Sequence, residues 1–235
     1  MSVIVHGVPG QSLQQVGAAQ YGKAAARCGG FFERVTAAVL EDVLAAAPGA
    51  FHLFHDLGGF RKVEGHGYGP ISPGINIDHL VLTGGGYAIV NAKGCGAGVL
   101  AVAPGNIGIL VKPDGTERRQ PWLDSRADYA AAGVVIRLTG LLGIVAFVAP
   151  RETTVHPSIV NARALTGGCL IMNTADLRAG ELLARLQPEV APGSPAAPEH
   201  VAALRRYLTA PEVPARAGAI SELASEPTAP VYPWE

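Results

Sequence analysis

The fold of this chain is decided by the stretch NIDHLVLTGGGYAIVNAKG, residues 76–94. Two apolar runs flank three consecutive glycines, a pattern typical of two β-strands joined by a tight turn. One run contains the acid Asp78, and the other ends in Asn91-Ala92-Lys93. Polar side chains on strands that are otherwise apolar need a partner or a function, so the pairing of the two strands matters.

A two-residue turn at Gly84-Gly85 predicts that Asp78 faces Asn91 directly, with Cβ atoms about 5 Å apart. Lys93 lies two residues beyond Asn91 and therefore points to the same face. A three-residue loop would shift the register by one residue and separate this cluster. The remainder of the face is predicted to be filled by Leu80, Leu82, Tyr87 and Ile89.

An acid, an amide and a lysine in one cluster suit two different roles. An Asp–Lys pair near a strand end is often a solvated salt bridge. The same groups can serve a divalent cation that hydrolyses phosphodiesters, because such cations take oxygen ligands, and a lysine orients water or stabilises charge on phosphorus. His79 should point to the opposite face, as a half-buried histidine with a satisfied hydrogen bond.

The rest of the chain predicts an α/β protein, in which helices lie on a mixed sheet. Helices are expected over residues 12–30, 31–49, 121–143, 175–187 and 199–208. Further strands are expected over residues 51–57, 98–104, 107–115, 144–150 and 168–174. Residues 58–74 are rich in Gly and Pro and should form a long loop, and such loops often carry function.

The composition bounds the function classes. A formal net charge of −1 gives no overall attraction to nucleic acid or to a membrane surface, so any phosphate contact must be local. The most apolar segment, residues 133–150, is interrupted by Arg137, Gly140 and Gly143, which favours a helix end and a buried strand over a membrane span. Three scattered cysteines predict a reducing, cytoplasmic location.

The hairpin resembles the nuclease-related domain, NERD, a branch of the PD-(D/E)xK restriction-endonuclease-like superfamily. The resemblance is carried by its Ile-Asp-His strand, glycine turn and strand ending near a lysine. It extends to GGFFERV, which contains Glu33, and to GCLIMNTADLRAGELLARL, and so covers roughly residues 20–187. It implies a restriction-endonuclease-like mixed β-sheet flanked by helices over residues 1–190. Residues 191–235 would be a linker, a short amphipathic helix and a tail; that helix could dock on the domain or on a second subunit.

The resemblance also implies roles for matching residues. Asp78 would be the main metal-binding carboxylate, Lys93 the motif lysine and Glu33 the helical acid that completes the site. The implied cation is Mg²⁺ or Mn²⁺, held by Asp78, Glu33 and Asn91.

Asn91 departs from the family pattern, because the family has Glu or Asp there. An amide oxygen coordinates a hard cation more weakly than a carboxylate. Three explanations stay open: a naturally inactive copy, a residue substituted in this chain, or a site that recruits another acid, for which Glu64 is the nearest candidate in sequence.

Basic and polar residues on either side of the hairpin could contact a nucleic-acid backbone. They are Arg61, Lys62, His66 and Tyr68 on the long loop, and Arg118, Arg119 and Arg126 further along. Solvated surface charge is the alternative for each of them. The sequence therefore predicts either a metal-dependent nuclease acting on DNA, with Asn91 weakening its site, or an inactive DNA- or protein-binding module of the same fold.

Overall fold

The computed structural model describes residues 2–13, 23–58, 76–105, 107–124, 127–161, 169–186 and 194–209. A six-stranded sheet has the strand order β1-β2-β3-β4-β8-β10, and a four-stranded sheet has the order β7-β6-β5-β9. The strands of the large sheet are β1 (Ser2–His6), β2 (Ala50–Leu57), β3 (Ile77–Leu82), β4 (Tyr87–Ala92), β8 (Gly143–Ala149) and β10 (Leu170–Asn173). Those of the small sheet are β5 (Gly98–Ala103), β6 (Ile107–Val111), β7 (Glu117–Arg119) and β9 (Thr153–Val155).

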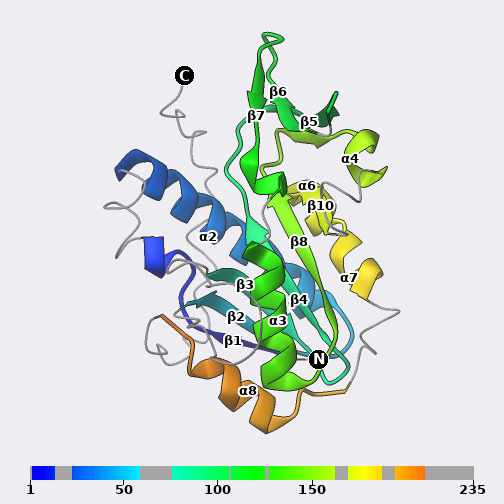
Figure 1. Cartoon of the computed structure of the whole chain (residues 1–235). Helices are drawn as coiled ribbons and strands as arrows, with labels where there is room; N and C mark the ends of the chain where they lie inside the picture. The colour runs from blue at the N-terminus through cyan, green and yellow to red at the C-terminus, as the bar shows by residue number, and fades with distance from the viewer. Residues whose placement is uncertain are drawn as a thin grey trace.

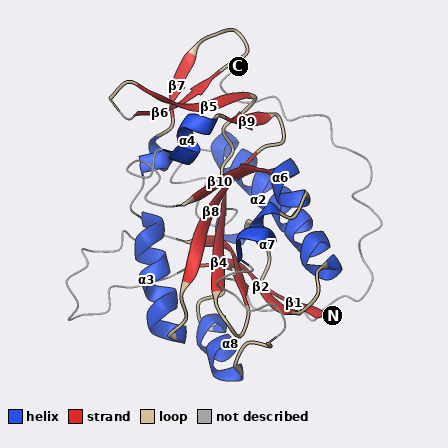
Figure 2. Ribbon diagram, turned by 90° about the vertical axis from the view of Figure 1, so that its right-hand side faces the viewer, coloured by secondary structure: helices blue, strands red, loops and turns tan. Residues whose placement is uncertain are grey.

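Helices lie on both faces of the large sheet, as the α/β prediction requires (Figures 1 and 2). They are α2 (Lys23–Ala46), α3 (Ala127–Thr139), α4 (Pro157–Asn161), α6 (Thr174–Arg178), α7 (Glu181–Leu186) and α8 (Pro198–Arg205), with a 3₁₀ turn over Pro121–Asp124. Strands β3 and β4 are antiparallel, whereas β8 runs parallel to both β4 and β10, so the sheet is mixed.

The register of the β3–β4 hairpin is the one predicted from the two-residue turn. His79 pairs with Val90, and the pairing continues to place Asp78 opposite Asn91. The polar residues therefore lie at the open end of the hairpin, away from the glycines. Strand β2 adds to β3 on the other side, again antiparallel.

The glycine turn between β3 and β4 allows the segment around Ser194 to approach it closely. Thr83 closes the turn, because its N–H donates to the carbonyl of Gly86 at 3.0 Å. The N–H of Gly84 donates to the carbonyl of Ser194 at 2.8 Å. A Cβ on Gly84 would lie 2.7 Å from the carbonyl oxygen of Pro195, so a side chain there would push the C-terminal segment away.

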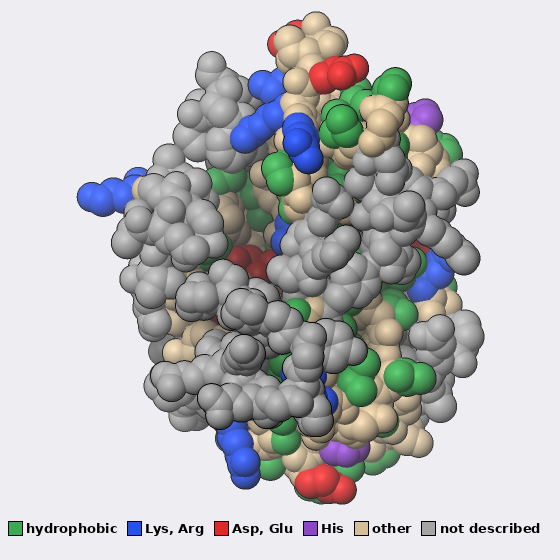
Figure 3. Space-filling view, viewed as in Figure 1, with side chains coloured by type: hydrophobic (Ala, Val, Ile, Leu, Met, Phe, Trp, Pro, Cys, Tyr) green, Lys and Arg blue, Asp and Glu red, His purple; other side chains and the backbone are tan. Residues whose placement is uncertain are grey.

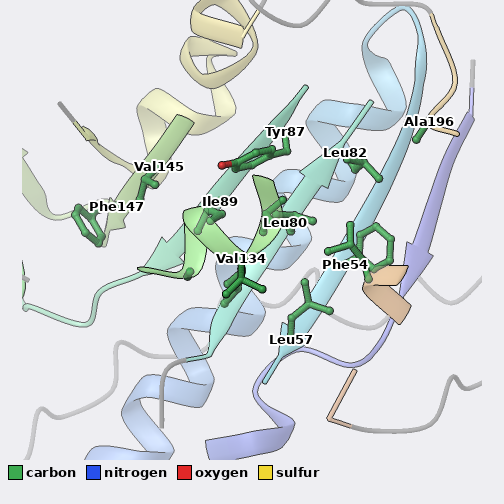
Figure 4. Close-up of a cluster of buried hydrophobic side chains, with 14 residues drawn as sticks. Phe54, Leu57, Leu80, Leu82, Tyr87, Ile89, Val134, Val145, Phe147 and Ala196 are labelled. Atoms are coloured by element: carbon green, nitrogen blue, oxygen red, sulfur yellow. The ribbon is translucent and has the colours of Figure 1, made fainter. Parts of the chain in front are cut away.

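Two apolar clusters pack on opposite faces of the large sheet. The first joins α2 to the sheet through residues such as Leu40, Leu44, Val81 and Val90. The second packs Leu80, Tyr87, Ile89 and Phe147 against α3 and α8, as Figure 4 shows. Because residues of β3 and β4 alternate between these clusters, both faces of the hairpin are buried.

The helix α8 docks on the domain itself. Ala196 and Leu204 are buried in the second apolar cluster beside α3. Leu208 forms an antiparallel bridge with Leu57, the last residue of β2. The amphipathic helix predicted over 199–208 could dock on its own domain or on a second subunit, and the structure shows it docked on its own domain.

Helix α2 is continuous across Gly29-Gly30, where two helices were predicted to meet, and residues 14–22 of the helix expected over 12–30 lie outside the described residues. The N-terminal segment crosses α2 at these two glycines. A Cβ on Gly29 would lie 2.9 Å from the side chain of Leu13, and a Cβ on Gly10 would lie 3.3 Å from Gly30. The glycines therefore mark a close crossing of two segments, and not a helix end.

Other boundaries also differ from the prediction. The helix expected over 121–143 is a 3₁₀ turn followed by α3, and the one expected over 175–187 divides into α6 and α7 at Gly180, whose φ is +86°. Strands β1, β7 and β9 and helix α4 were not predicted. Among the described residues, no helix is long and apolar enough to cross a membrane. The apolar segment 133–150 forms the end of α3 and strand β8.

Candidate functional site

The open end of the hairpin joins Asp78 and Asn91 by hydrogen bonds. The backbone N–H of Asp78 donates to the side-chain oxygen of Asn91 at 3.2 Å. The Asp78 carboxylate accepts a hydrogen bond from the N–H of Ala92 at 2.8 Å. Both side chains are buried, with exposed fractions of 7% and 2%. The predicted juxtaposition of the acid and the amide is therefore present, and backbone groups hold it in place.

Lys93 lies just past the end of β4, between β8 and α2. Its N–H donates to the carbonyl of Val148 at 2.8 Å, and its Nζ lies 5.2 Å from the centre of the Phe147 ring. The chain then passes α2 so closely that a Cβ on Gly94 would lie 2.7 Å from the Phe32 ring. This contact brings the strand end against the helix turn that carries the next residue of the site.

Glu33 is that residue, and its side chain is 4% exposed. Its Oε2 atom is buried without a hydrogen-bond partner. Burial, and then the nearby charges of Asp78 and Asp56, raise the pKa of Glu33 to about 9, against the opposing effects of Lys93 and of the N–H of Gly10. Glu33, Asp78 and Lys93 therefore lie within electrostatic reach of one another, although they come from a helix and two strands.

Asp56 is a third acid at this site, and the sequence analysis missed it. His55 pairs with His79 and Leu57 with Ile77, which places Asp56 opposite Asp78 across β2 and β3. Two carboxylates directly opposite each other in a sheet repel. A pairing of the strand 51–57 with the hairpin would have shown this row of Asp56, Asp78 and Asn91, but the long loop between β2 and β3 hides the register.

The histidine of the hairpin differs from its prediction. His79 is fully buried, and its Nδ1 lies 2.9 Å from Nδ1 of His55, whose Nε2 lies 3.3 Å from a carboxylate oxygen of Glu41 on α2. The other ring nitrogen of His79, Nε2, is buried without a partner. Burial, and then His55, hold the pKa of His79 well below its usual value, so the ring is neutral. The prediction of a half-buried ring was wrong, because both faces of the sheet are covered, whereas the predicted hydrogen bond is present in the contact with His55.

The donor set fits a divalent cation in part. Glu33 offers a buried oxygen without a partner, and a cation there would relieve its repulsion with Asp78. Among the residues that the structure describes, no group of three or more His, Cys, Asp or Glu is arranged to hold a metal ion. The side-chain oxygen of Asn91 already accepts from Asp78. What is present is thus two carboxylates and an amide, a weaker set than three acids.

The predicted nucleic-acid contacts are only partly described. Arg61, Lys62, Glu64, His66, Tyr68 and Arg126 lie outside the described residues. Arg118 and Arg119 are exposed on β7, and as neighbours on a strand they point to opposite faces. Burial raises the pKa of Cys95 to about 11 while Arg118 lowers it, so Arg118 is near the loop that follows Lys93. The two described arginines, Arg118 and Arg119, therefore do not lie on one face of β7.

Figure 3 shows the charged side chains on the face of the molecule that is viewed in Figure 1. A hollow near the middle of this face has Asp or Glu atoms at its floor and Lys or Arg atoms beside it (Figure 3). Further Lys and Arg side chains, mixed with acidic ones, lie at the upper end, where Figure 1 shows β6 and β7. An anionic ligand would meet local positive charge there and not a uniformly basic surface.

Comparisons with known proteins add no relative. No family model, no curated protein and no solved structure matches the chain. The fold therefore stands as an α/β arrangement with mixed sheets flanked by helices.

Proposed function

We propose that the protein is a nuclease-fold protein that acts on nucleic acid and hydrolyses phosphodiester bonds with Mg²⁺ or Mn²⁺. The observation that carries the proposal is the buried, unpartnered Oε2 of Glu33 in a site shared with Asp78 and Lys93. A buried acid with a strongly raised pKa beside a second acid is typical of functional sites. An acid on a helix, an acid on a strand and a lysine two residues past the paired strand position also match the NERD resemblance.

Each residue has a role that follows from its place. Glu33 and Asp78 would hold the cation, and Glu33 would release its proton on binding, because a cation favours the charged carboxylate. A bound Mg²⁺ or Mn²⁺ would supply an activated water and neutralise charge on the phosphate. Lys93, held between Phe147 and the end of β4, would donate to a phosphate oxygen as charge develops there. Asn91 orients Asp78 and adds no charge.

A second candidate is a non-catalytic module of the same fold that binds DNA or a protein partner. The observation that favours it is the hydrogen bond from Asp78 to the side-chain oxygen of Asn91, at the position where the NERD pattern has an acid. A site with one charge fewer binds a divalent cation less tightly.

A cleavage assay separates the two candidates. Plasmid and linear DNA are incubated with Mg²⁺ or Mn²⁺ and with the wild type, Asp78→Ala or Asn91→Asp. Asp114→Asn is the control, since Asp114 is exposed in the turn between β6 and β7. Cleavage that disappears only in Asp78→Ala supports the nuclease. Cleavage by Asn91→Asp alone supports the binding module for this sequence. If neither the variants nor the wild type cut or bind DNA, both nucleic-acid proposals are wrong, and only binding to a protein partner is left.

The partner and the location belong to the same proposal. DNA is the proposed nucleic acid, and RNA is tested by the same assay with a labelled RNA strand. A reducing, cytoplasmic location agrees with three cysteines that form no disulfide, two of them buried. A homo-oligomer would be detected by light scattering of the full chain.

A further inference from the structure

The N-terminal strap, residues 7–13, crosses the helix turn that carries Glu33. A Cβ on Gly10 would lie 3.3 Å from Gly30 and 3.6 Å from the guanidinium of Arg34, so the strap contacts α2 on both sides of Glu33. A hydrogen bond from the N–H of Gly10 lowers the pKa of the Glu33 carboxyl. The strap therefore contacts the one acid of the site that is carried by a helix.

Asp56 holds the strap in this position. Its carboxylate accepts a hydrogen bond from the backbone N–H of Ser12 and a longer one, at 3.4 Å, from the side-chain amide of Asn76. Asn76 also donates to the hydroxyl of Ser12 at 3.0 Å, so hydrogen bonds join Asp56, Ser12 and Asn76 in a closed ring of three residues. The backbone carbonyl of Asp56 accepts from both the N–H and the hydroxyl of Thr209, at 3.2 and 3.1 Å. One residue thus ties together the strap, the start of β3 and the C-terminal segment.

The backbone of Asp56 is adapted to this role. Its φ is +55°, and among the described residues no other non-glycine has a positive φ. Phe54 and Leu57 lie in the same apolar cluster, although residues three apart on a regular strand point to opposite faces. A non-glycine with a left-handed backbone is strained, and such strain persists where the surroundings fix it, often beside a functional site.

We propose that Asp56 is a positioning residue of the candidate site: its carboxylate fixes the strap through Ser12, and the strap fixes the carboxyl group of Glu33 through Gly10. The inference rests on the proposed function only in treating Glu33 as a functional residue of the candidate site. Asp56 itself touches no substrate in this account, since its oxygens accept hydrogen bonds from the chain.

Two substitutions at Asp56 separate this role from others. Asp56→Gly removes the carboxylate but tolerates the left-handed backbone, and Asp56→Asn also tolerates it and keeps an oxygen that accepts from Ser12. Amide hydrogen exchange of the full chain is followed by NMR. In Asp56→Gly, amide exchange at Ser12 and Gly10 should accelerate by roughly tenfold to hundredfold, because the strap loses one hydrogen bond to a charged group. In Asp56→Asn it should stay within about threefold of wild type. Asp114→Gly, which removes an exposed carboxylate that accepts from Thr116, is the matched control.

A second readout follows Glu33 itself. The carboxyl carbon resonance of Glu33, identified by its loss in Glu33→Gln, should shift at pH 6 in Asp56→Gly and stay in place in Asp56→Asn.

Three outcomes would overturn the proposal: unchanged amide exchange in Asp56→Gly, amide exchange in Asp56→Asn as fast as in Asp56→Gly, or a Glu33 resonance that stays in place in Asp56→Gly. None of these measurements needs metal or nucleic acid, so their failure is distinct from a failure to bind Mn²⁺ or to cut DNA.

Discussion

The backbone N–H of Asp78 donates to the side chain of Asn91, and the Asp78 carboxylate accepts from the residue that follows Asn91. The amide thus fixes the acid without adding a second negative charge at position 91. A carboxylate at position 91 would accept the same N–H but would repel the carboxylate of Asp78 across the buried site.

Asn91→Asp should therefore lower the stability of the metal-free protein. The introduced carboxylate adds a buried like charge, and we expect a loss of about 1–3 kcal/mol in the free energy of unfolding. Saturating Mn²⁺ should return most of this loss, because a cation binds the native site and not the unfolded chain. Urea unfolding with and without Mn²⁺ measures both numbers. A variant that Mn²⁺ leaves equally destabilised would argue against a cation between these residues.

Glu33 should make stability fall as pH rises. Its pKa is about 9 in the folded protein against 4.5 for an ordinary Glu, so the folded state holds a proton that the unfolded chain releases above pH 4.5. The cost is absent at pH 4.5 and grows, by up to about 1.4 kcal/mol per pH unit, until pH 9. Glu33→Gln removes this slope. Unfolding free energies at pH 5, 6.5 and 8 should converge at low pH and favour the variant at high pH; parallel curves would contradict the buried acid.

The glycines of the strap crossing should respond in opposite directions. A Cβ on Gly30 would lie 3.4 Å from the end of Arg34 and 4.0 Å from the carbonyl oxygen of Gly10, both ordinary contacts, and the residue lies inside a helix. Gly30→Ala should therefore stabilise the protein by about 0.5–1 kcal/mol. Gly10→Ala should destabilise it, because its φ is +74° and its Cβ would contact Gly30. Thermal unfolding of the two variants measures the contrast. Equal effects at the two positions would mean that the strap does not cross α2 as described.

The two arginines of β7 form a matched pair for nucleic-acid binding. Arg118 is near the loop after Lys93, and Arg119 points to the other face of the small sheet. Arg118→Ala should weaken DNA binding by about 3–10-fold. It should also reduce the slope of log affinity against log salt concentration by the amount that about one phosphate contact contributes, while Arg119→Ala should change both quantities little. Fluorescence anisotropy at several salt concentrations tests this. A larger effect from Arg119→Ala would place the DNA on the opposite face.

The parts of the fold that the sequence predicts are those set by local rules. The Gly84-Gly85 turn fixes the register of the hairpin, and the alternation of apolar residues fixes its faces. The continuity of α2 could not be predicted, since it depends on the strap that meets Gly29 and Gly30 from elsewhere in the chain. The small strands β7 and β9 are three residues each and carry no periodicity long enough to detect.

The candidate site was predictable only as far as the hairpin reaches. The facing of Asp78 and Asn91 follows from the turn, whereas the approach of Glu33 was expected from the family resemblance alone. Asp56 was missed because its position depends on the pairing of β2 with β3, across a loop whose length hides the register. The left-handed backbone of Asp56 could not be predicted from the sequence pattern either, although Asp tolerates that conformation better than most residues.

The most direct test of the central claim, that Glu33 and Asp78 form one cation site, is calorimetric titration of the wild type with Mn²⁺ at pH 7 in buffers of different ionisation enthalpy. The account predicts one Mn²⁺ bound per chain with release of about one proton, because Glu33 is protonated until the cation binds. Glu33→Gln should bind more weakly and release no proton. Absence of Mn²⁺ binding to the wild type, or binding that Glu33→Gln and Asp78→Asn leave unchanged, would contradict it.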